Sequence, residues 1–409
     1  MVFEILLEYT GAIFLIILSY TVPLRIVSIR SNRYHLVAFF IVITSLQLVS
    51  LFNYFIFTLP GAELDASAFS DYARNAINQG VVPTFSIGTV VYEYILLAAY
   101  LIFGDTKLVG QSLSILVAVV SIIIILRIAK KFNIKESYAT VLLLIIGLTP
   151  SFLLYNSLTF REVFQLLGLV GGIYFAYEAF SKKSVARLFV STGFHQVLLA
   201  LSFTLILISW IFYYLHMGVQ KKILIRNILV SGVAILAAGY VVIVSIPSDG
   251  GNDYLKQLVE SGGVVNMIGH YRGVIENVHP RSTYGIEVDT TSLLGTTAGL
   301  VVSYGHYLFG PGISSIEKPI DLVPFINSLG RILVFLFFLY LLIKKIKLPD
   351  GLGYILIVYL SVTAMWSVGT TNYGQAFRHN SLTDWILAVV LIIGIQALVK
   401  LKNQARTQT

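Results

Sequence analysis

Long apolar runs separated by short polar connectors are the main pattern along this chain. Several runs reach roughly 18 apolar residues, close to the length a helix needs to cross the hydrocarbon core of a bilayer. The sequence therefore predicts an all-α polytopic membrane protein with about eleven transmembrane helices. We place them at 5–24, 36–57, 108–128, 137–155, 163–180, 186–200, 201–217, 223–246, 323–343, 353–370 and 382–400.

Three stretches fit this pattern less simply. Val90–Gly104 and Leu293–Phe309 are apolar but short for a crossing, and counting either as one puts basic connectors on the wrong side. We expect both to be interfacial or re-entrant helices on the outer face. Segment 184–217 is basic at both ends, which predicts two short helices with a turn near Leu199–Ser202.

The basic residues gather in the short connectors. Five connectors and the C-terminal tail region hold 19 of the 28 Lys and Arg, and placing them in the cytoplasm leaves 17 of the 20 acidic residues outside. This predicts an outer N-terminus and a cytoplasmic tail at 401–409. The first apolar segment lacks a basic start and a cleavage site, so we expect it to remain as a helix. The chain 1–409 then forms a single transmembrane domain with a membrane core at 5–400 and long outer segments at 58–107 and 247–322.

Composition agrees with this picture. The chain is 57% hydrophobic and only 12% charged, whereas soluble domains carry about 25% charged residues. The net charge of +8 would suit nucleic acid, but the basic residues follow the membrane pattern, so we expect no nucleic-acid partner. Cys is absent, which excludes disulfides, thiolate metal sites and Cys nucleophiles.

Polar side chains recur where predicted spans meet the outer surface, and we expect the spans themselves to be almost free of charge. Ionisable groups at one level of the membrane suit a substrate with a lipid tail and a polar head, whereas transporters keep such groups inside the spans. Four separate regions contribute Asp65 and Asp71, Arg161 and Glu162, Arg272, His279, Arg281 and Tyr284, and Arg378 and His379.

The segment GAELDASAFSDYA carries the strongest candidate. Asp65, Phe69 and Ala73 follow an i, i+4, i+8 spacing, one stripe of a helix. A carboxylate near a dry boundary can remove a proton from a hydroxyl, so Asp65 is a candidate general base. The alternative is a helix-capping or solvated carboxylate. Asp71 is expected to be solvated or paired with Arg74.

The other candidates would bind phosphate. A guanidinium suits bidentate recognition of phosphate, which makes Arg161 a candidate. Glu162 is favoured at a helix N-terminus by the dipole alone. It could be structural, orient Arg161, or share a divalent cation, Mg²⁺ or Mn²⁺, with Asp65; we rank the cation last because no dense acidic or His cluster requires it.

The remaining cationic candidates each have a simpler alternative. Arg272, His279 and Arg281 could stabilise a leaving phosphate, or neutralise neighbouring carboxylates. Arg378 and His379 could bind the same phosphate, or extend to the membrane interface as long amphipathic side chains do.

Taken together, these residues resemble the GT-C superfamily of integral-membrane glycosyltransferases over about residues 36–400. The similar features, in order, are the Asp65–Phe69–Ala73 stripe and the segments LLAAYLIFGD, RIAKK, TPSFLLYNSLTFRE, RSTYG, LFGPG and RHN. Phe69 stands where Tyr is common, and Leu64 interrupts the usual acidic pair. RHN replaces RHR, and helix 5–24 precedes the family's first helix.

The resemblance implies transfer of a sugar from a polyprenyl-phosphate carrier to a glycan or lipid-linked acceptor on the outer face of the cell membrane. Asp65 would act as the base that removes the proton of the acceptor hydroxyl. Displacement in a single step would invert the anomeric centre. Arg161, with Arg272, Arg281 or Arg378, would stabilise the departing phosphate, and Tyr284 would support the site.

Two further classes stay open. A Wzy-type polymerase of lipid-linked oligosaccharide repeats, or a related O-antigen ligase, would depend on Arg and His more than on a carboxylate. A transporter or flippase would place polar groups inside the spans and break helices there. A structural scaffold would not need cationic groups in four outer regions.

Overall fold

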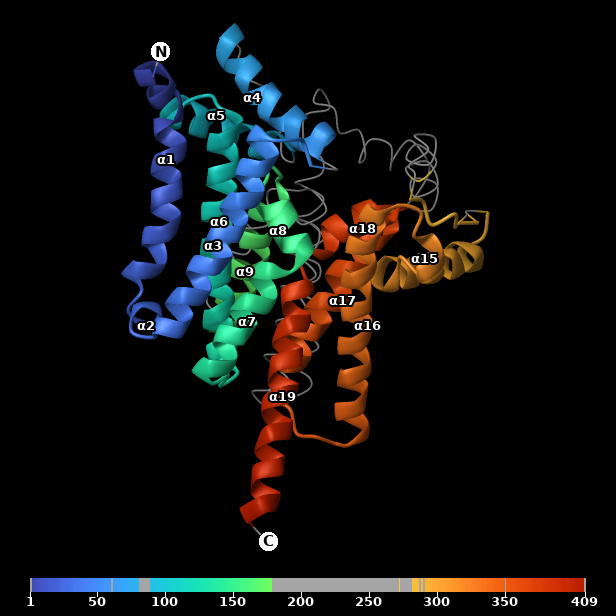
Figure 1. Ribbon diagram of the computed structural model, residues 1–409. Coiled ribbons are helices and arrows are strands. Elements are labelled where there is room, and N and C mark those ends of the chain that lie inside the picture. Colours follow the sequence, from blue (N-terminus) through green and yellow to red (C-terminus); the bar gives the residue numbers. More distant parts are fainter. Residues whose placement is uncertain are drawn as a thin grey trace, which may run out of the picture.

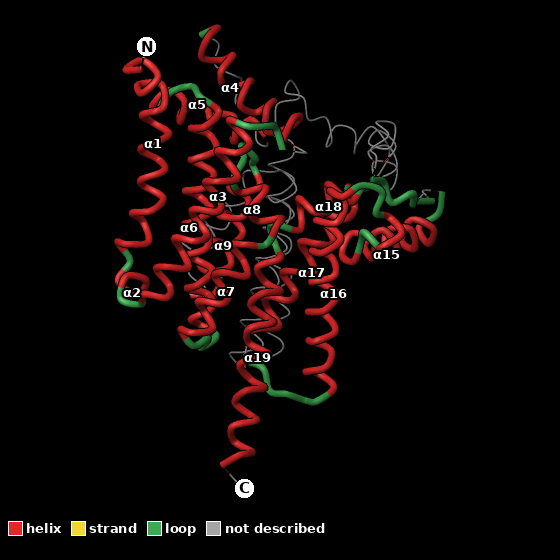
Figure 2. The backbone as a smooth tube through the Cα atoms, in the orientation of Figure 1, coloured by secondary structure: helices red, strands yellow, loops and turns green. Residues whose placement is uncertain are grey.

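The structure is a computed structural model that describes residues 2–59, 62–80, 89–178, 272, 282–286, 288–289, 291–349 and 351–407. These residues form helices and loops, with no strand among them (Figure 2). The predicted spans 186–200, 201–217 and 223–246 lie outside these ranges, as do His279 and Arg281. The prediction of an all-α membrane protein is confirmed.

The helices fall into two groups along the chain (Figure 1). The first comprises α1 (Val2–Arg25), α2 (Val27–Arg30), α3 (Arg33–Phe55), the π-helical turn Ala62–Ala66, α4 (Ser67–Gln79), α5 (Thr89–Phe103), α6 (Lys107–Lys131), α7 (Glu136–Leu148), α8 (Pro150–Asn156) and α9 (Glu162–Glu178). The second comprises α15 (Leu293–Phe309), the 3₁₀ turns Ile313–Ser315 and Pro319–Asp321, α16 (Leu322–Ile343), α17 (Leu352–Gly369), α18 (Tyr373–Asn380) and α19 (Asp384–Thr407).

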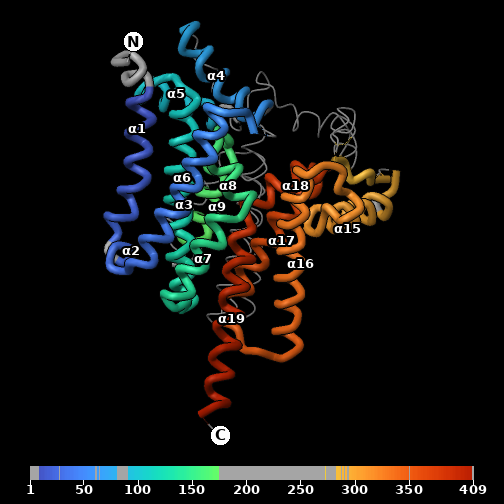
Figure 3. Tube along the Cα trace, viewed as in Figure 1, coloured from blue at the N-terminus to red at the C-terminus, as the bar shows by residue number. Residues whose placement is uncertain are grey.

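Five helices in the described ranges are long and apolar enough to cross a membrane, or six if the bent pair α7–α8 counts as one span. The five are α3, α6, α16 with its preceding turn, α17 and α19. Helices also occupy the predicted spans 5–24 and 163–180, as α1 and α9. The predicted number of eleven is not confirmed. Figure 3, coloured along the sequence, shows the blue part of α1 and the red end of α19 at opposite ends of the molecule.

Two predicted boundaries need correction. The span 137–155 is not continuous, because α7 and α8 meet at an angle of 61°. Thr149 adopts φ −59° and ψ 131°, since the ring of Pro150 disfavours helical geometry in the residue before it. The predicted tail 401–409 is also helical through Thr407, because LVKLKNQART contains neither Gly nor Pro to end α19.

The two apolar stretches too short for spans are single helices, α5 and α15. In Figure 1, α15 runs across the direction of α16 at the level of α18. A 17-residue helix lying crosswise fits the expected interfacial position.

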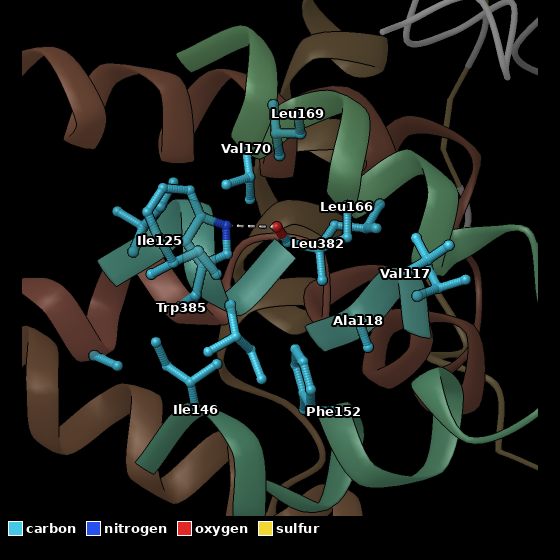
Figure 4. Close-up of a cluster of buried hydrophobic side chains, with 14 of the residues drawn as sticks. Val117, Ala118, Ile125, Ile146, Phe152, Leu166, Leu169, Val170, Leu382 and Trp385 are labelled. Atoms are coloured by element: carbon cyan, nitrogen blue, oxygen red, sulfur yellow. Dashed lines mark hydrogen bonds between the residues drawn. The ribbon is translucent and has the colours of Figure 1, made fainter. Parts of the chain in front are cut away.

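A buried apolar core joins the two groups of helices. Figure 4 shows side chains of α6, α7, α8 and α9 around Trp385 of α19, whose indole nitrogen donates to the Leu382 carbonyl oxygen at 3.0 Å. Trp385 is 2% exposed, and Ile125 and Val170 beside it are fully buried. This packing holds the start of α19, and with it the adjacent α18, against the N-terminal helices.

Candidate active site

A cavity of about 900 Å³ lies between α3, α8, α16 and α18. Most of its wall is apolar, which is typical of ligand sites that position a few polar groups. The apolar lining includes Leu48, Val49, Phe52, Leu59, Leu153, Leu154, Ile320, Val323 and Pro324. The polar lining includes Asp65, Ser282, Ser315, Asp321, Asn372, Gln375 and Arg378.

The short helix α18 presents Arg378 to this cavity. The side chain of Asn372 caps α18 by accepting from the Gln375 backbone N–H at 2.9 Å. Before the helix, the chain pairs with segment 282–286: the Tyr284 N–H donates to the Thr371 carbonyl at 2.8 Å, and the Tyr373 N–H to the Ser282 carbonyl at 3.0 Å. These bonds fix the start of α18 relative to the cavity wall.

Gly310 in the LFGPG segment leaves room for the same helix. A side-chain carbon at this position would come within 2.2 Å of the Tyr373 ring, too close for any real contact. The Tyr373 hydroxyl also lies 3.0 Å from His306 Nδ1 at the end of α15. The turn after α15 therefore has to be glycine for α18 to pack as it does.

Arg378 lies between two carboxylates. Its Nε and Nη2 each lie 2.7 Å from Oε1 of Glu162, and its Nη1 forms an ion pair with Oδ2 of Asp65. The Phe160 ring packs 4.6 Å from the guanidinium carbon. The Glu162 side chain is 2% exposed, whereas that of Asp65 is 52% exposed. One edge of the guanidinium is thus fixed inside the protein, and Nη1 is directed to the more open side.

The two carboxylates keep Arg378 charged. Burial alone would lower the pKa of Arg378, but Glu162 and then Asp65 raise it above its usual range. A cation that is held rigidly at the wall of a mostly apolar cavity can bind a phosphate with charge-assisted hydrogen bonds.

Asp65 lies in the π-helical turn just before α4. Phe69 and Ala73 of the predicted stripe lie on α4 and pack inward: Ala73 is 1% exposed, and the Phe69 ring contacts Tyr92 edge-on at 5.2 Å. This packing holds α4 against α5, and Asp65, in the turn before α4, lines the cavity. Irregular turns of this type often mark functional sites in helices.

Arg161 and Glu162 form a long ion pair, and Glu162 pairs more closely with Arg378. Arg161 lies over the Phe69 ring at 5.8 Å, with its Nε 3.9 Å from Glu162 Oε1. Glu162 is closer to Arg378, so it orients Arg378 more directly than Arg161. Neither Arg161 nor Glu162 lines the cavity.

Three other predicted site residues form structural contacts away from the lining. Arg272 is 3% exposed and donates to the Ser303 hydroxyl at 3.2 Å and to the carbonyls of Val368 and Ile286 at 3.3 Å. Tyr284 is 9% exposed and packs on Tyr373 with ring centres 4.8 Å apart. Asp71 pairs with Lys107 at 3.3 Å and Arg74 at 4.0 Å, the local pairing we expected.

His379 faces away from the cavity. Its ring stacks on Trp366 at 4.0 Å, and its Nδ1 lies 3.2 Å from the Thr370 hydroxyl. Burial, followed by the charges of Arg378 and Arg161, lowers the pKa of His379 well below its ordinary value. The imidazole is therefore neutral, which does not suit the phosphate contact predicted for it.

Two residues of this region escaped the sequence analysis. Glu93 is half-buried on α5; burial raises the pKa of its carboxyl, and the charge of Arg161 partly offsets this. Glu93 is the one acidic residue in the apolar segment TVVYEYILLAAYLIF, and this feature of the sequence could have identified it. Gln375 lines the cavity three residues before Arg378, and only this helical spacing pointed to it.

The spans are not as free of charge as predicted. Arg331, inside α16, lies 3.5 Å from Asp384 at the start of α19, and it donates from Nε to the Leu308 carbonyl at 2.8 Å. Asn327 also donates to Asp384, at 2.9 Å. Arg331 and Asp384 lie in different predicted spans. Judging the charge of each span separately therefore did not reveal that the two residues pair.

A shared metal ion would conflict with this arrangement. Asp65 and Glu162 both pair with Arg378, so a divalent cation between them would have to displace the guanidinium. Within the described ranges, no group of three or more His, Asp or Glu side chains could hold a metal ion. Arg378 itself supplies the positive charge at this position.

Fold and site together define an all-α membrane protein with a large, mostly apolar cavity and a fixed cation at its wall. The chain matches no family model, no curated protein and no solved structure.

Proposed function

We propose that this protein transfers a sugar from a polyprenyl-phosphate carrier to a hydroxyl of a glycan or lipid-linked acceptor. The observation that carries the proposal is the placement of Arg378. Its guanidinium is held by buried Glu162, directs Nη1 to a mostly apolar cavity, and contacts the exposed carboxylate of Asp65 there.

The apolar walls suit a long hydrocarbon tail. Leu48 and Phe52 on α3 line the cavity and are also 61% and 39% exposed on the surface of the molecule. Across the cavity, Ile320 is 44% exposed just before α16. A lipid tail could leave the cavity between these apolar surfaces while its phosphate stays beside Arg378.

The proposed reaction is a single displacement. The acceptor hydroxyl oxygen forms a bond to the anomeric carbon as the bond from that carbon to the phosphate oxygen breaks. The hydroxyl proton passes to Asp65, and the electron pair leaves with the polyprenyl phosphate. Arg378 stabilises the charge on this leaving group. Attack from the opposite face inverts the anomeric centre.

Asp65 and the substrate phosphate would compete for the same nitrogen. Glu162 holds Nε and Nη2 of Arg378, so Nη1 is the position a phosphate would take. Phosphate binding would then release the Asp65 carboxylate next to the reacting carbon. Entry of the donor therefore converts a paired carboxylate into a free base.

The charge pattern favours an extracytoplasmic reaction. Thr159, three residues before Glu162, packs beside Gly110 near the start of α6, at the end of this helix away from its basic residues Lys130 and Lys131. Basic connectors are typical of the cytoplasmic side. Nucleotide sugars are cytoplasmic, so an outer site would need a lipid-borne donor. We place the protein in the cell membrane on this reasoning.

A lipid-linked substrate transporter is the second candidate, because two observations favour it. Arg331 and Asp384 form a buried ion pair inside the bundle, and the α7–α8 segment is broken by 61°. Both features occur in transporters. A transporter would move the lipid without breaking the bond between sugar and phosphate.

Release of polyprenyl phosphate from a polyprenyl-phosphate sugar distinguishes the two candidates. The full-length protein in detergent or liposomes would be supplied with a panel of such donors and with hydroxyl acceptors. Paired removal of charge, Arg378→Gln with Glu162→Gln, avoids leaving a buried carboxylate without its partner. We expect this variant to fold and to lose transfer, while Arg74→Gln retains it.

Binding gives an independent test. We expect the wild type to bind a polyprenyl phosphate more tightly than the parent polyprenol, with the preference lost in the paired variant. Equal binding of the two lipids would overturn the role of Arg378. If transfer requires Arg378 and persists in Asp65→Asn, the oligosaccharide polymerase replaces the single-sugar transferase as the better interpretation.

A further inference from the structure

Gly374, the second residue of α18, is the exposed position of that short helix. It lines the cavity together with Ser282 and Asn372. A side-chain carbon added at Gly374 would lie 3.4 Å from Asn372 Oδ1 and 3.9 Å from Ser282 Oγ, which are ordinary contact distances. These three residues therefore lie close together, and we call them the polar end of the cavity.

The packing of the protein does not require a glycine at position 374. Among the described residues, no further atom outside α18 lies within 4 Å of the added carbon, and the backbone of Gly374 is not in the left-handed region that favours glycine. Gly310 differs, because the Tyr373 ring leaves no room for a side chain there. Gly374 thus leaves space in the cavity that an alanine would occupy.

This open surface lies one helical turn from Arg378. The two residues are four apart on α18, which places them on one face of the helix and about 6 Å apart along its axis. Both line the cavity, and Nη1 of Arg378 is where the proposed function places the phosphate. A group attached to that phosphate would extend along the same wall to Gly374.

A phosphate that joins a lipid to a sugar has two substituents, and the cavity offers each a different surface. Leu48 and Phe52 of the apolar wall are 61% and 39% exposed, which suits the lipid tail. The polar end is then left for the sugar, because hydroxyl groups that leave water need polar partners.

We propose that Gly374 is a specificity-determining residue. Because it has no side chain, the ring of the transferred sugar has room to lie against the first turn of α18, beside the Ser282 hydroxyl. This inference rests on the proposed function, since Arg378 would hold the phosphate attached to that sugar.

Two lipids separate the place of the sugar from that of the phosphate. They are a polyprenyl phosphate and the polyprenyl-phosphate sugar that the wild type transfers, each bound without acceptor. Gly374→Ala should weaken binding of the sugar conjugate by about 5- to 150-fold, which corresponds to an overpacking cost of about 1–3 kcal/mol. Its affinity for the sugar-free polyprenyl phosphate should equal that of the wild type.

Gly353→Ala is the matched control. Gly353 is also the exposed second residue of its helix, α17, and it does not line the cavity. A side-chain carbon added there has no neighbour within 4 Å among the described residues. This variant should bind both lipids as the wild type does.

Three results would count against the inference. If Gly374→Ala binds the sugar conjugate as tightly as the wild type, the sugar does not lie against Gly374, and the role of Arg378 is unaffected. Equal weakening of both lipids would also overturn the inference, because the added methyl group would then act on the phosphate or the fold. Absence of transfer from every donor by the wild type would overturn the proposed function, and this inference with it.

Discussion

Replacement of Asp65 by Asn should change binding and catalysis in opposite directions. The substitution keeps the shape of the side chain but removes the charge that pairs with Nη1 of Arg378. If phosphate competes with Asp65 for this nitrogen, the donor should bind more tightly to the variant. If Asp65 also removes the acceptor proton, the variant should be nearly inactive.

The two magnitudes follow from the structure. The Asp65 side chain is 52% exposed, and ion pairs of such exposure contribute about 0.2–1 kcal/mol. Loss of this competition should therefore tighten binding of a polyprenyl phosphate by about 1.4- to 5-fold. Loss of a general base costs about 10²- to 10⁴-fold in rate, so the catalytic effect is much larger.

Both quantities can be measured on one preparation. Direct binding of a polyprenyl phosphate gives the affinity, and single-turnover release of the same lipid from its sugar conjugate gives the chemical step. Asp71→Asn is the matched control, because Asp71 pairs with Lys107 and Arg74 and does not line the cavity. Its affinity and rate should stay close to those of the wild type.

Two results would refute the reasoning. Turnover of Asp65→Asn close to that of the wild type would show that Asp65 is not the base. Weaker binding of the polyprenyl phosphate would show that Asp65 and phosphate do not compete for Arg378, and that Asp65 instead contributes to the binding site.

The remaining predictions concern stability. Arg331→Met leaves Asp384 buried without its charged partner and should cost about 3–5 kcal/mol; the double variant with Asp384→Leu should recover most of it, and thermal unfolding in detergent measures both. Because burial and then Arg378 and Arg161 lower the pKa of His379 well below its ordinary value of about 6.5, the unfolded chain takes up a proton there that the folded chain does not. Stability should therefore fall as the pH drops below about 6.5, by at most about 1.4 kcal/mol per pH unit. His379→Gln should reduce that slope in unfolding scans, and an unchanged slope would exclude this residue as its source.

Local patterns were read correctly where the controlling physics is local. Phe69 and Ala73 pack on the inner face of α4, because helical geometry alone places residues four apart on one face, whereas Asp65 belongs to the π-helical turn before the helix. The short helices α5 and α15 follow from the length of their apolar runs. By contrast, the sequence analysis missed the break between α7 and α8 at Pro150. Proline acts locally, but the apolar run 137–155 is long enough to be interpreted as one span.

The sequence by itself determined that the chain is helical and enters a membrane, because the length of an apolar run and the period of a helix depend only on neighbouring residues. Tertiary structure alone decided which charges meet. Arg378 pairs with Glu162, 216 residues away, and with Asp65, 313 residues away. Buried charges need partners, but the fold selects which side chain supplies them, and that choice turned an arginine near the end of the chain into the centre of the site.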